Sequence, residues 1–181
     1  MVQSVELHAP SGALQDSYRD LVADFVAAGE ELVPFTLAFD FADFNALLVR
    51  LDACSRGVGL PEGFVAHTTF WLVRNQTEVV EASNIRHSLT SALRREGGNI
   101  GYGIRPSARG QHLGTEILRQ SLQRASGLGL TKILLTCSKA NVASIKIMLQ
   151  NGAVLESEEY LPERGEIVQR YWIQLAANGS A

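Results

Sequence analysis

Cysteine and proline are scarce in this sequence, and a long uncharged apolar run is missing. Only two cysteines, Cys54 and Cys137, occur among 181 residues, and they form no C-x-x-C pair. Two thiols are too few for a disulfide framework, so a small disulfide-stapled protein is excluded. No apolar run reaches the roughly 18 residues of a membrane span, and the N-terminus lacks the basic and apolar parts of a secretory signal. We expect a cytoplasmic protein with reduced thiols and no membrane partner.

An excess of basic residues is also absent. Lysine and arginine total 16 against 19 acidic residues, which gives a formal net charge of −3. General nucleic-acid binders are more often basic, because neutralising phosphate supplies most of their affinity. Hydrophobic residues make up 46% of the chain and charged residues 19%, a balance that excludes a disordered protein. We expect a globular protein with no nucleic-acid partner and no metal site.

Internal repeats, low-complexity tracts and linker-like stretches are missing too. The chain length therefore predicts one domain over 1–181. Within it we expect a strand and helices in 1–64, the core in 65–175 and a frayed tail at 176–181. Apolar periodicity predicts strands at 2–7, 68–73 and 79–89, helices around 21–26 and 44–51, a turn at 75–76 and a polar stretch at 90–96.

The clearest pattern lies in the second half of the chain. A strand, a loop, an amphipathic helix and a short apolar strand follow one another, and such units close with a right-handed crossover and parallel strands. Asn141 is a suitable cap for the next helix, and Gly152 ends it. The elements are a strand at 99–104, a loop at 105–111, a helix at 113–125, a strand at 133–135, and a terminal hairpin of 154–160 with 167–175.

The loop from Arg109 to Thr115 has the composition of an anion-binding site. It precedes a helix, whose first turn leaves backbone N–H groups unpaired and carries partial positive charge. Its glycines allow close approach of a ligand, and Arg105 and Arg109 could pair with phosphate oxygens. The nucleotide P-loop and the dinucleotide fingerprint are both absent. Alone, the loop fits a phosphate cradle and equally a tight turn with solvated arginines.

This loop resembles that of the GNAT superfamily of acetyl-CoA-dependent N-acyltransferases. The family pattern is Arg/Gln-x-x-Gly-x-Gly/Ala at the start of a helix, and Arg109, His112 and Gly114 stand at its positions. Asn141 and Ser144 also follow in the family's order. The resemblance covers about 70–175, and in closer detail it points to a little-characterised branch of predicted acetyltransferases. The fragments that suggest this branch are Ile85-Arg86-His87, Gly97 to Tyr102, Ile104 to Ser107 and Arg170 to Ile173.

The resemblance implies an α/β fold with a GNAT-like mixed sheet, in which splayed central parallel strands are flanked by helices. The splayed strands would be about Asn99–Ile104 and Lys132–Cys137, with acetyl-CoA as cosubstrate in the gap between them. Backbone groups near Tyr102 and Ile104 would hold pantetheine, and the amides of 111–115 would hold the pyrophosphate. The implied cofactor contacts are Tyr102, Ile104, Arg109, Gly110, Gln111, His112, Leu113, Gly114, Thr115, Asn141 and Ser144.

Two positions depart from the family pattern. His112 replaces the first glycine of the loop, so its Cβ crowds the phosphate, although histidine tolerates unusual backbone angles better than most residues. Met148 stands where many members carry a tyrosine that protonates the departing thiolate, and we expect it at the cleft. We expect His112 to weaken cofactor binding rather than abolish it, and the missing tyrosine to affect only leaving-group protonation, which matters by about 2 kcal/mol at pH 7.

Deprotonating the attacking amine is the largest demand of the implied reaction, at roughly 4.6 kcal/mol for a lysine-like amine at pH 7. His87 and Glu81 are candidate catalytic bases, because both lie near the cofactor strand and share a face if their strand is regular. Tyr102 is a candidate hydroxyl donor, and Tyr160 could replace the missing acid. The alternatives are a structural histidine, an exposed strand carboxylate, and tyrosines that only pack.

The leading hypothesis is an N-acetyltransferase that moves an acetyl group from acetyl-CoA to a small-molecule or peptide amine by direct attack. The alternative is a non-catalytic CoA-binding regulatory or interaction module, and a phosphate module for another nucleotide is a third possibility. We expect a monomer or homodimer, with the helices of 16–56 on the acceptor side. An acidic hairpin cluster either attracts a cationic amine or is merely solvated: Glu156, Glu158, Glu159, Glu163 and Glu166.

Overall fold

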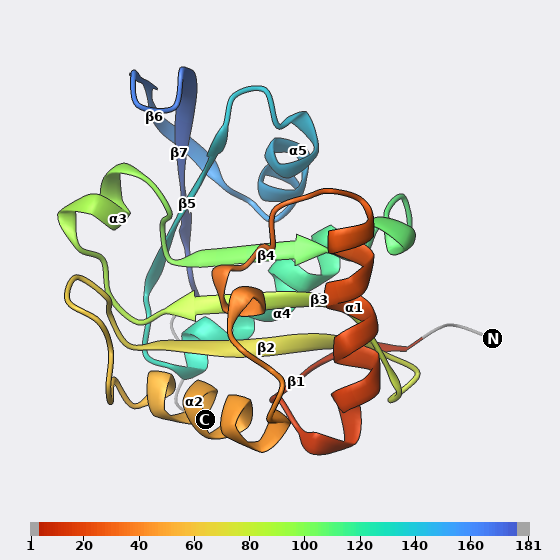
Figure 1. The fold of residues 1–181 in the computed structure, drawn as a ribbon. Helices are drawn as coiled ribbons and strands as arrows, with labels where there is room; N and C mark the ends of the chain where they lie inside the picture. Colours follow the sequence, from red (N-terminus) through yellow and green to blue (C-terminus); the bar gives the residue numbers. More distant parts are fainter. Residues whose placement is uncertain (1–3, 177–181) are drawn as a thin grey trace.

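The computed structural model describes residues 4–176 and shows two groups of strands with helices packed around them (Figure 1). Residues 2 and 3 of the expected first strand, and 177–181 of the expected tail, lie outside the described residues. The strands are β1 (Val5–His8), β2 (His67–Arg74), β3 (Glu78–Arg86), β4 (Ile100–Ile104), β5 (Lys132–Ser138), β6 (Val154–Leu161) and β7 (Glu166–Gln174). The helices are α1 (Gln15–Ala27), α2 (Phe44–Ser55), α3 (Ser91–Arg95), α4 (Leu113–Gly127) and α5 (Val142–Gln150).

The strands form two antiparallel sheets. One is four-stranded in the order β1-β2-β3-β4, and the other is three-stranded in the order β5-β7-β6. Helices α1 and α2 cover one face of the larger sheet, where Tyr18 and Trp71 are buried, and α4 covers the opposite face with Ile117 and Leu118 (Figure 1). β3 is therefore an inner strand with both faces covered. Among residues 4–176, no helix is both long and apolar enough to cross a membrane.

Asn99 joins the two sheets at the point where β4 leaves β5. Its backbone N–H donates to the Leu134 carbonyl oxygen at 2.7 Å, and its side-chain Oδ1 accepts from the Leu134 N–H at 2.8 Å. The side chain thus replaces a strand backbone as hydrogen-bond partner. A Cβ on Gly98 would collide with the same Leu134 carbonyl, so glycine is required there. No ladder continues between β4 and β5 in the described chain, and the strands diverge (Figure 1).

The expected fold, with splayed central strands flanked by helices, is confirmed, although the two strands belong to separate sheets. The expected elements are present with two differences. β3 ends at Arg86, three residues before the expected end of that strand at residue 89. The polar stretch at 90–96 contains the short helix α3, which Thr90 caps by accepting the Leu93 N–H at 3.2 Å. The threonine cap was the available signal for this helix.

Candidate functional site

A cavity of about 730 Å³ opens beside β4, on the side where the two sheets diverge. Its walls come from four parts of the chain that are distant in sequence. They are the second half of β4, the loop and first turn that lead into α4, one face of α5, and the linker between α1 and α2, residues 28–43. We call this last segment the α1–α2 linker.

The loop before α4 presents unpaired backbone N–H groups at this cavity. Gly110 and His112 both have left-handed backbone angles, with φ of +77° and +59°. Such successive turns orient neighbouring N–H groups into a concave row. Among the described residues, no protein acceptor is recorded for the N–H groups of 110–112, and those of the first turn of α4 have none within the helix. Together with the helix dipole, this arrangement favours an anion.

The open edge of β4 presents backbone groups at the same cavity. The Arg86 N–H donates to the Asn99 carbonyl and the Arg105 N–H to the Val80 carbonyl, so odd-numbered positions of this strand face β3. Backbone groups of an antiparallel strand alternate in direction, so those of Tyr102 and Ile104 point away from β3. Both residues line the cavity, and the Ile104 carbonyl accepts a hydrogen bond from Arg109 Nη2 at 3.3 Å.

Glycines on β4 let the α1–α2 linker pack directly on the strand. A Cβ on Gly103 would collide with the Val33 carbonyl oxygen, and one on Gly101 would lie 3.7 Å from Pro34 Cβ. Val33 and Gly103 both line the cavity. The linker therefore forms one wall of the cavity, and its close approach to β4 needs the glycine at 103.

Ion pairs connect the acidic end of α1 and its linker to the α4 loop. Arg109 Nη1 and Nη2 donate to Glu30 Oε1 and Oε2 at 2.7 and 2.5 Å. Asp24 Oδ2 accepts from Arg105 Nε at 3.0 Å and from Ser107 Oγ at 2.5 Å. The hydrogen bond from Arg109 lowers the pKa of Glu30, and those from Ser107 and Arg105 lower the pKa of Asp24. Both carboxylates are thus held in their charged form.

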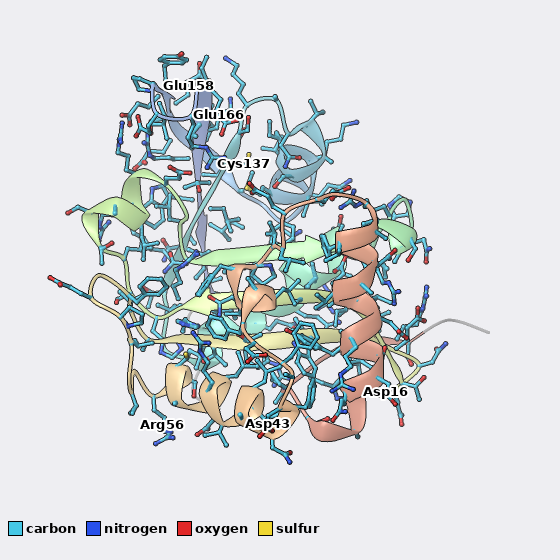
Figure 2. The ribbon with its side chains drawn as sticks, in the orientation of Figure 1. Asp16, Asp43, Arg56, Cys137, Glu158 and Glu166 are labelled. Carbon is cyan, nitrogen blue, oxygen red and sulfur yellow. The ribbon has the colours of Figure 1, made fainter. Side chains whose placement is uncertain are left out.

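Tyr102 and Ser144 meet at the inner end of the cavity. The Tyr102 hydroxyl lies 3.3 Å from Ser144 Oγ, across the gap between β4 and α5. Burial raises the pKa of Tyr102 to about 12, so the phenol keeps its proton at neutral pH. Cys137 on β5 lies next to α5 (Figure 2), and burial raises the pKa of its thiol to about 11. The hydroxyl is therefore a hydrogen-bond donor, and the thiol is a poor nucleophile.

Nearly all of the residues expected to contact the cofactor line this one cavity. The exception is Gln111, whose Oε1 accepts a hydrogen bond from Arg74 Nη1 at 2.9 Å on the outer side of the loop. The residues that line the cavity are Tyr102, Ile104, Arg109, Gly110, His112, Leu113, Gly114, Thr115, Asn141 and Ser144. The expected helix cap is also present, because Asn141 Oδ1 accepts the Ser144 N–H at 3.0 Å.

The structure places neither candidate base in the cavity. Glu81 is 0% exposed, so the expectations of a residue at the cleft mouth and of an exposed strand carboxylate are both wrong. It lies opposite Leu72 and Ile104 on the inner strand β3, where covered faces exclude water. His87 follows β3 at its other end, with Nε2 2.8 Å from Thr68 Oγ1 and a pKa that burial lowers. This partner fits a structural histidine.

A further expectation about the site is wrong, and the acidic cluster can be compared with its contacts. Met148 is 1% exposed and packs in the core, so it does not border the cleft; Ser144 and Ile147 occupy the cavity face of α5 instead. The acidic cluster lies in the hairpin of β6 and β7, where Figure 2 shows Glu158 and Glu166, and its carboxylates have local partners. Glu158 pairs with Lys139, Glu159 with Arg95 and Arg170, Glu163 with Arg95, Glu166 with Arg164, and Glu156 accepts from Trp172 Nε1.

The sequence did not reveal the acidic residues that do line the cavity. Glu30 and Glu31 follow the end of α1 in the α1–α2 linker, and both are cavity residues. Their only local signal is the sequence Gly29-Glu30-Glu31 after a helix, which is also typical of a solvated turn. Within residues 4–176, no group of three or more His, Cys, Asp and Glu side chains is arranged to hold a metal ion.

The comparison with family models decides the family. The model described as "Acetyltransferase (GNAT) domain" matches residues 58–154, more than half of the chain. The chain belongs to the GNAT acetyltransferase family. The match spans β2 to the start of β6, and so includes β4, the α4 loop and α5 of this GNAT domain. The expectation of a GNAT acetyltransferase, made from the loop and the elements around it, is confirmed.

Solved structures of other GNAT proteins share the fold along nearly the whole chain. The ribosomal alpha-N-protein acetyltransferase RimL, in complex with CoA disulfide-bonded to a cysteine, is 16% identical with a TM-score of 0.69, covering 97% of this chain and 96% of its own. The microcin self-immunity acetyltransferase MccE, with acetyl-CoA and AMP, is 14% identical with a TM-score of 0.66, covering 94% and 92%. Spermidine N-acetyltransferase from Vibrio cholerae, a dodecamer, is 15% identical with a TM-score of 0.62, covering 94% of each chain. No curated protein sequence matches significantly.

Proposed function

We propose that this GNAT protein transfers the acetyl group of acetyl-CoA to an amine acceptor by direct attack of the amine. The observation that carries the proposal is one cavity that holds both a row of unpaired loop amides and the open backbone edge of β4. An elongated ligand with an anionic part and an amide-containing part is complementary to these two surfaces. Partial burial raises the pKa of the Cys137 thiol to about 11, which favours direct attack over a covalent intermediate on the protein.

The residues of the cavity fit acetyl-CoA. When bound, acetyl-CoA supplies an acetyl group activated as a thioester. The N–H groups of 110–115 and the guanidinium of Arg109 would hold the pyrophosphate, and the backbone of Tyr102 and Ile104 would hold the pantetheine. Gly114 lets the start of α4 pack directly against Ile147 and Ile104, because a Cβ there would collide with both side chains. A preorganised amide beside a polarised carbonyl contributes about 3–4 kcal/mol to such a reaction.

Tyr102 would orient a hydrogen bond toward the departing sulfur. Its pKa of about 12 means that full proton transfer to a thiolate of pKa about 8.5 would be uphill by about 5 kcal/mol. Tyr102 therefore stabilises the sulfur as a donor and keeps its proton, while Ser144 Oγ holds the hydroxyl in place. This role would take over the function that a tyrosine at position 148 serves in many relatives.

Replacing Tyr102 with phenylalanine is expected to lower kcat by up to about thirtyfold, because one hydrogen bond to the leaving sulfur is lost. CoA affinity is expected to stay within about twofold, since the proposed cofactor contacts of Tyr102 are backbone groups. Steady-state kinetics and calorimetry measure the two effects. Tyr160→Phe on the exposed part of β6 is the matched control, because its side chain is 59% exposed and lies outside the cavity. An unchanged kcat for Tyr102→Phe would remove the tyrosine from the mechanism.

His112→Gly is expected to tighten CoA binding by about three- to tenfold. His112 stands at φ +59° in the loop, where its Cβ narrows the approach of the phosphate and a glycine would not. Asn75→Gly is the matched control, because Asn75 has φ +49° in the turn between β2 and β3, away from the cavity. Calorimetric titration with CoA compares both variants with the natural protein. Equal or weaker binding by His112→Gly would show that the imidazole assists the phosphate.

The function itself is tested by incubating the full chain with acetyl-CoA and a panel of small amines and peptides. We expect release of the CoA thiol that depends on the amine, with an equal amount of N-acetylated product detected by mass spectrometry. CoA binding without turnover on any amine would favour the alternative of a non-catalytic CoA-binding module. Displacement of CoA by adenine nucleotides alone would favour a phosphate module for another nucleotide.

A further inference from the structure

The charges that line the cavity are divided between its two walls. The α4 loop and α5 contribute the cations Arg109 and Lys146, whereas the α1–α2 linker contributes the anions Glu30 and Glu31. Arg109 and Glu30 join the two walls, and both guanidinium Nη groups of Arg109 are used in this pair. Neither Lys146 nor Glu31 has a recorded ion-pair partner among the described residues.

The guanidinium of Arg109 cannot make a two-pronged contact with Glu30 and with a phosphate at the same time. Its Nη1 and Nη2 both donate to the Glu30 carboxylate, and Nη2 also donates to the Ile104 carbonyl. A two-pronged contact with a phosphate uses the same N–H groups. A carboxylate left beside that phosphate would also repel it. A two-pronged contact between Arg109 and a phosphate at the α4 loop therefore requires Glu30 to leave Arg109.

Glu30 then becomes a free carboxylate on the wall that the α1–α2 linker forms. Its side chain is 40% exposed, so it is accessible from the cavity. An amine acceptor carries positive charge at neutral pH before it reacts, since the pKa of an alkylamine is about 10.4. Glu30 and Tyr102 line the same cavity, and Arg109, which holds Glu30, also donates to the carbonyl of Ile104, two residues after Tyr102 on β4.

From this geometry we infer that Glu30 is a specificity-determining residue that exchanges partners. It pairs with Arg109 in the free protein, and in the CoA-bound protein it binds a second positive charge of the acceptor. The acceptor class is a short alkyl diamine or an equivalent dication, with its reacting amine near Tyr102 and its other ammonium at Glu30. The inference rests on the proposed function, because it takes the α4 loop as the CoA phosphate site. Bound CoA is therefore expected to raise the affinity of the protein for a dication, and a bound dication to raise its affinity for CoA.

The first test measures CoA affinity by calorimetry in the absence of any amine. Glu30→Gln is expected to bind CoA about three- to tenfold more tightly than the natural protein, because Arg109 no longer has to be released. Glu31→Gln is the matched control: it removes an equal charge from the same wall without disturbing the pair, and its CoA affinity is expected to change by less than about twofold. An equal change in both variants, or no change in Glu30→Gln, would overturn the partner exchange.

The second test titrates diaminopentane and pentylamine into the natural protein and Glu30→Gln, each with and without saturating CoA. Because CoA lacks the acetyl group, the readout is binding rather than turnover. Diaminopentane is expected to bind the CoA-saturated natural protein at least about fivefold more tightly than pentylamine does, and more tightly than it binds the CoA-free protein. Both preferences should vanish in Glu30→Gln. Equal binding of the two amines, or a preference that persists in Glu30→Gln, would contradict the inference. Failure of CoA to bind the natural protein would instead overturn the proposed function.

Discussion

Glu81→Gln is expected to become progressively more stable than the natural protein as the pH rises above about 5. Glu81 is 0% exposed, and neither of its side-chain oxygens has a hydrogen-bond partner in the described structure. Burial therefore raises the pKa of this carboxyl well above its usual range. In the unfolded chain the same group ionises near pH 4.3, so the folded state binds the extra proton at higher pH.

The sign of this effect follows from proton binding. The pKa of this carboxyl is higher in the folded chain than in the unfolded chain. The free energy of unfolding is therefore greatest below the unfolded pKa, and it falls as the pH rises from the unfolded pKa toward the folded pKa. Each pH unit in that window lowers the free energy of unfolding by about 1.4 kcal/mol, or roughly 3–5 °C in Tm for a protein of this size. Glutamine does not titrate, so the loss is absent in Glu81→Gln.

Thermal unfolding of the natural protein and of Glu81→Gln at several pH values gives the difference between their Tm values. The other titratable groups are the same in both proteins, so their contributions cancel in this difference. Glu81→Met is a second variant, which removes both the titration and the unpaired polar atoms while keeping a similar volume. It should show the same pH trend with added stability at every pH. A Tm difference that stays constant between pH 5 and pH 8 would mean that Glu81 is not sealed from water.

Asn99→Ala is expected to lower the free energy of unfolding by about 2–4 kcal/mol, which is roughly 5–15 °C in Tm. Asn99 is 3% exposed, its Oδ1 accepts the Leu134 N–H, and its Nδ2 donates to the Arg86 carbonyl at 3.2 Å. Removal of the side chain leaves two buried backbone groups without these partners at the junction of the sheets. CoA binding should weaken as well, because the same junction sets the opening of β4 from β5.

The control for this substitution is Asn45→Ala on the exposed surface of α2. It removes the same atoms from a position without a recorded hydrogen bond, so stability should change by less than about 0.5 kcal/mol. Calorimetric unfolding of both variants gives the comparison. A loss of less than 1 kcal/mol in Asn99→Ala would mean that the backbone contacts of this residue alone hold the sheets together.

The sequence was sufficient for the elements and for the loop because both depend on local chemistry. The alternation of Ile100, Tyr102 and Ile104 is a property of one strand, and the glycines and arginines before α4 are contiguous. Asn141 and the helix that it caps are local in the same sense. These signals arise within a dozen residues, so no knowledge of tertiary packing was needed to interpret them.

The errors concern residues whose position is set by packing between distant elements. Met148 and Ser144 are four residues apart and lie within about 40° of each other around α5, so only the exact rotation of α5 places Ser144 in the cavity and Met148 in the core. Glu81 is polar, so the sequence favoured an exposed position, but helices on both faces of β3 bury it. Glu30 contacts Arg109 across 79 positions of sequence, and no periodicity connects the two.

The central claim is that the amides of the α4 loop and the edge of β4 hold one CoA molecule. The most direct measurement is an amide-resolved NMR titration of the ¹⁵N-labelled full chain with CoA. The account predicts that the largest shift changes fall at the N–H groups of 110–115, with further changes at Tyr102 and Ile104. Changes confined to other surfaces, or none at millimolar CoA, would contradict it.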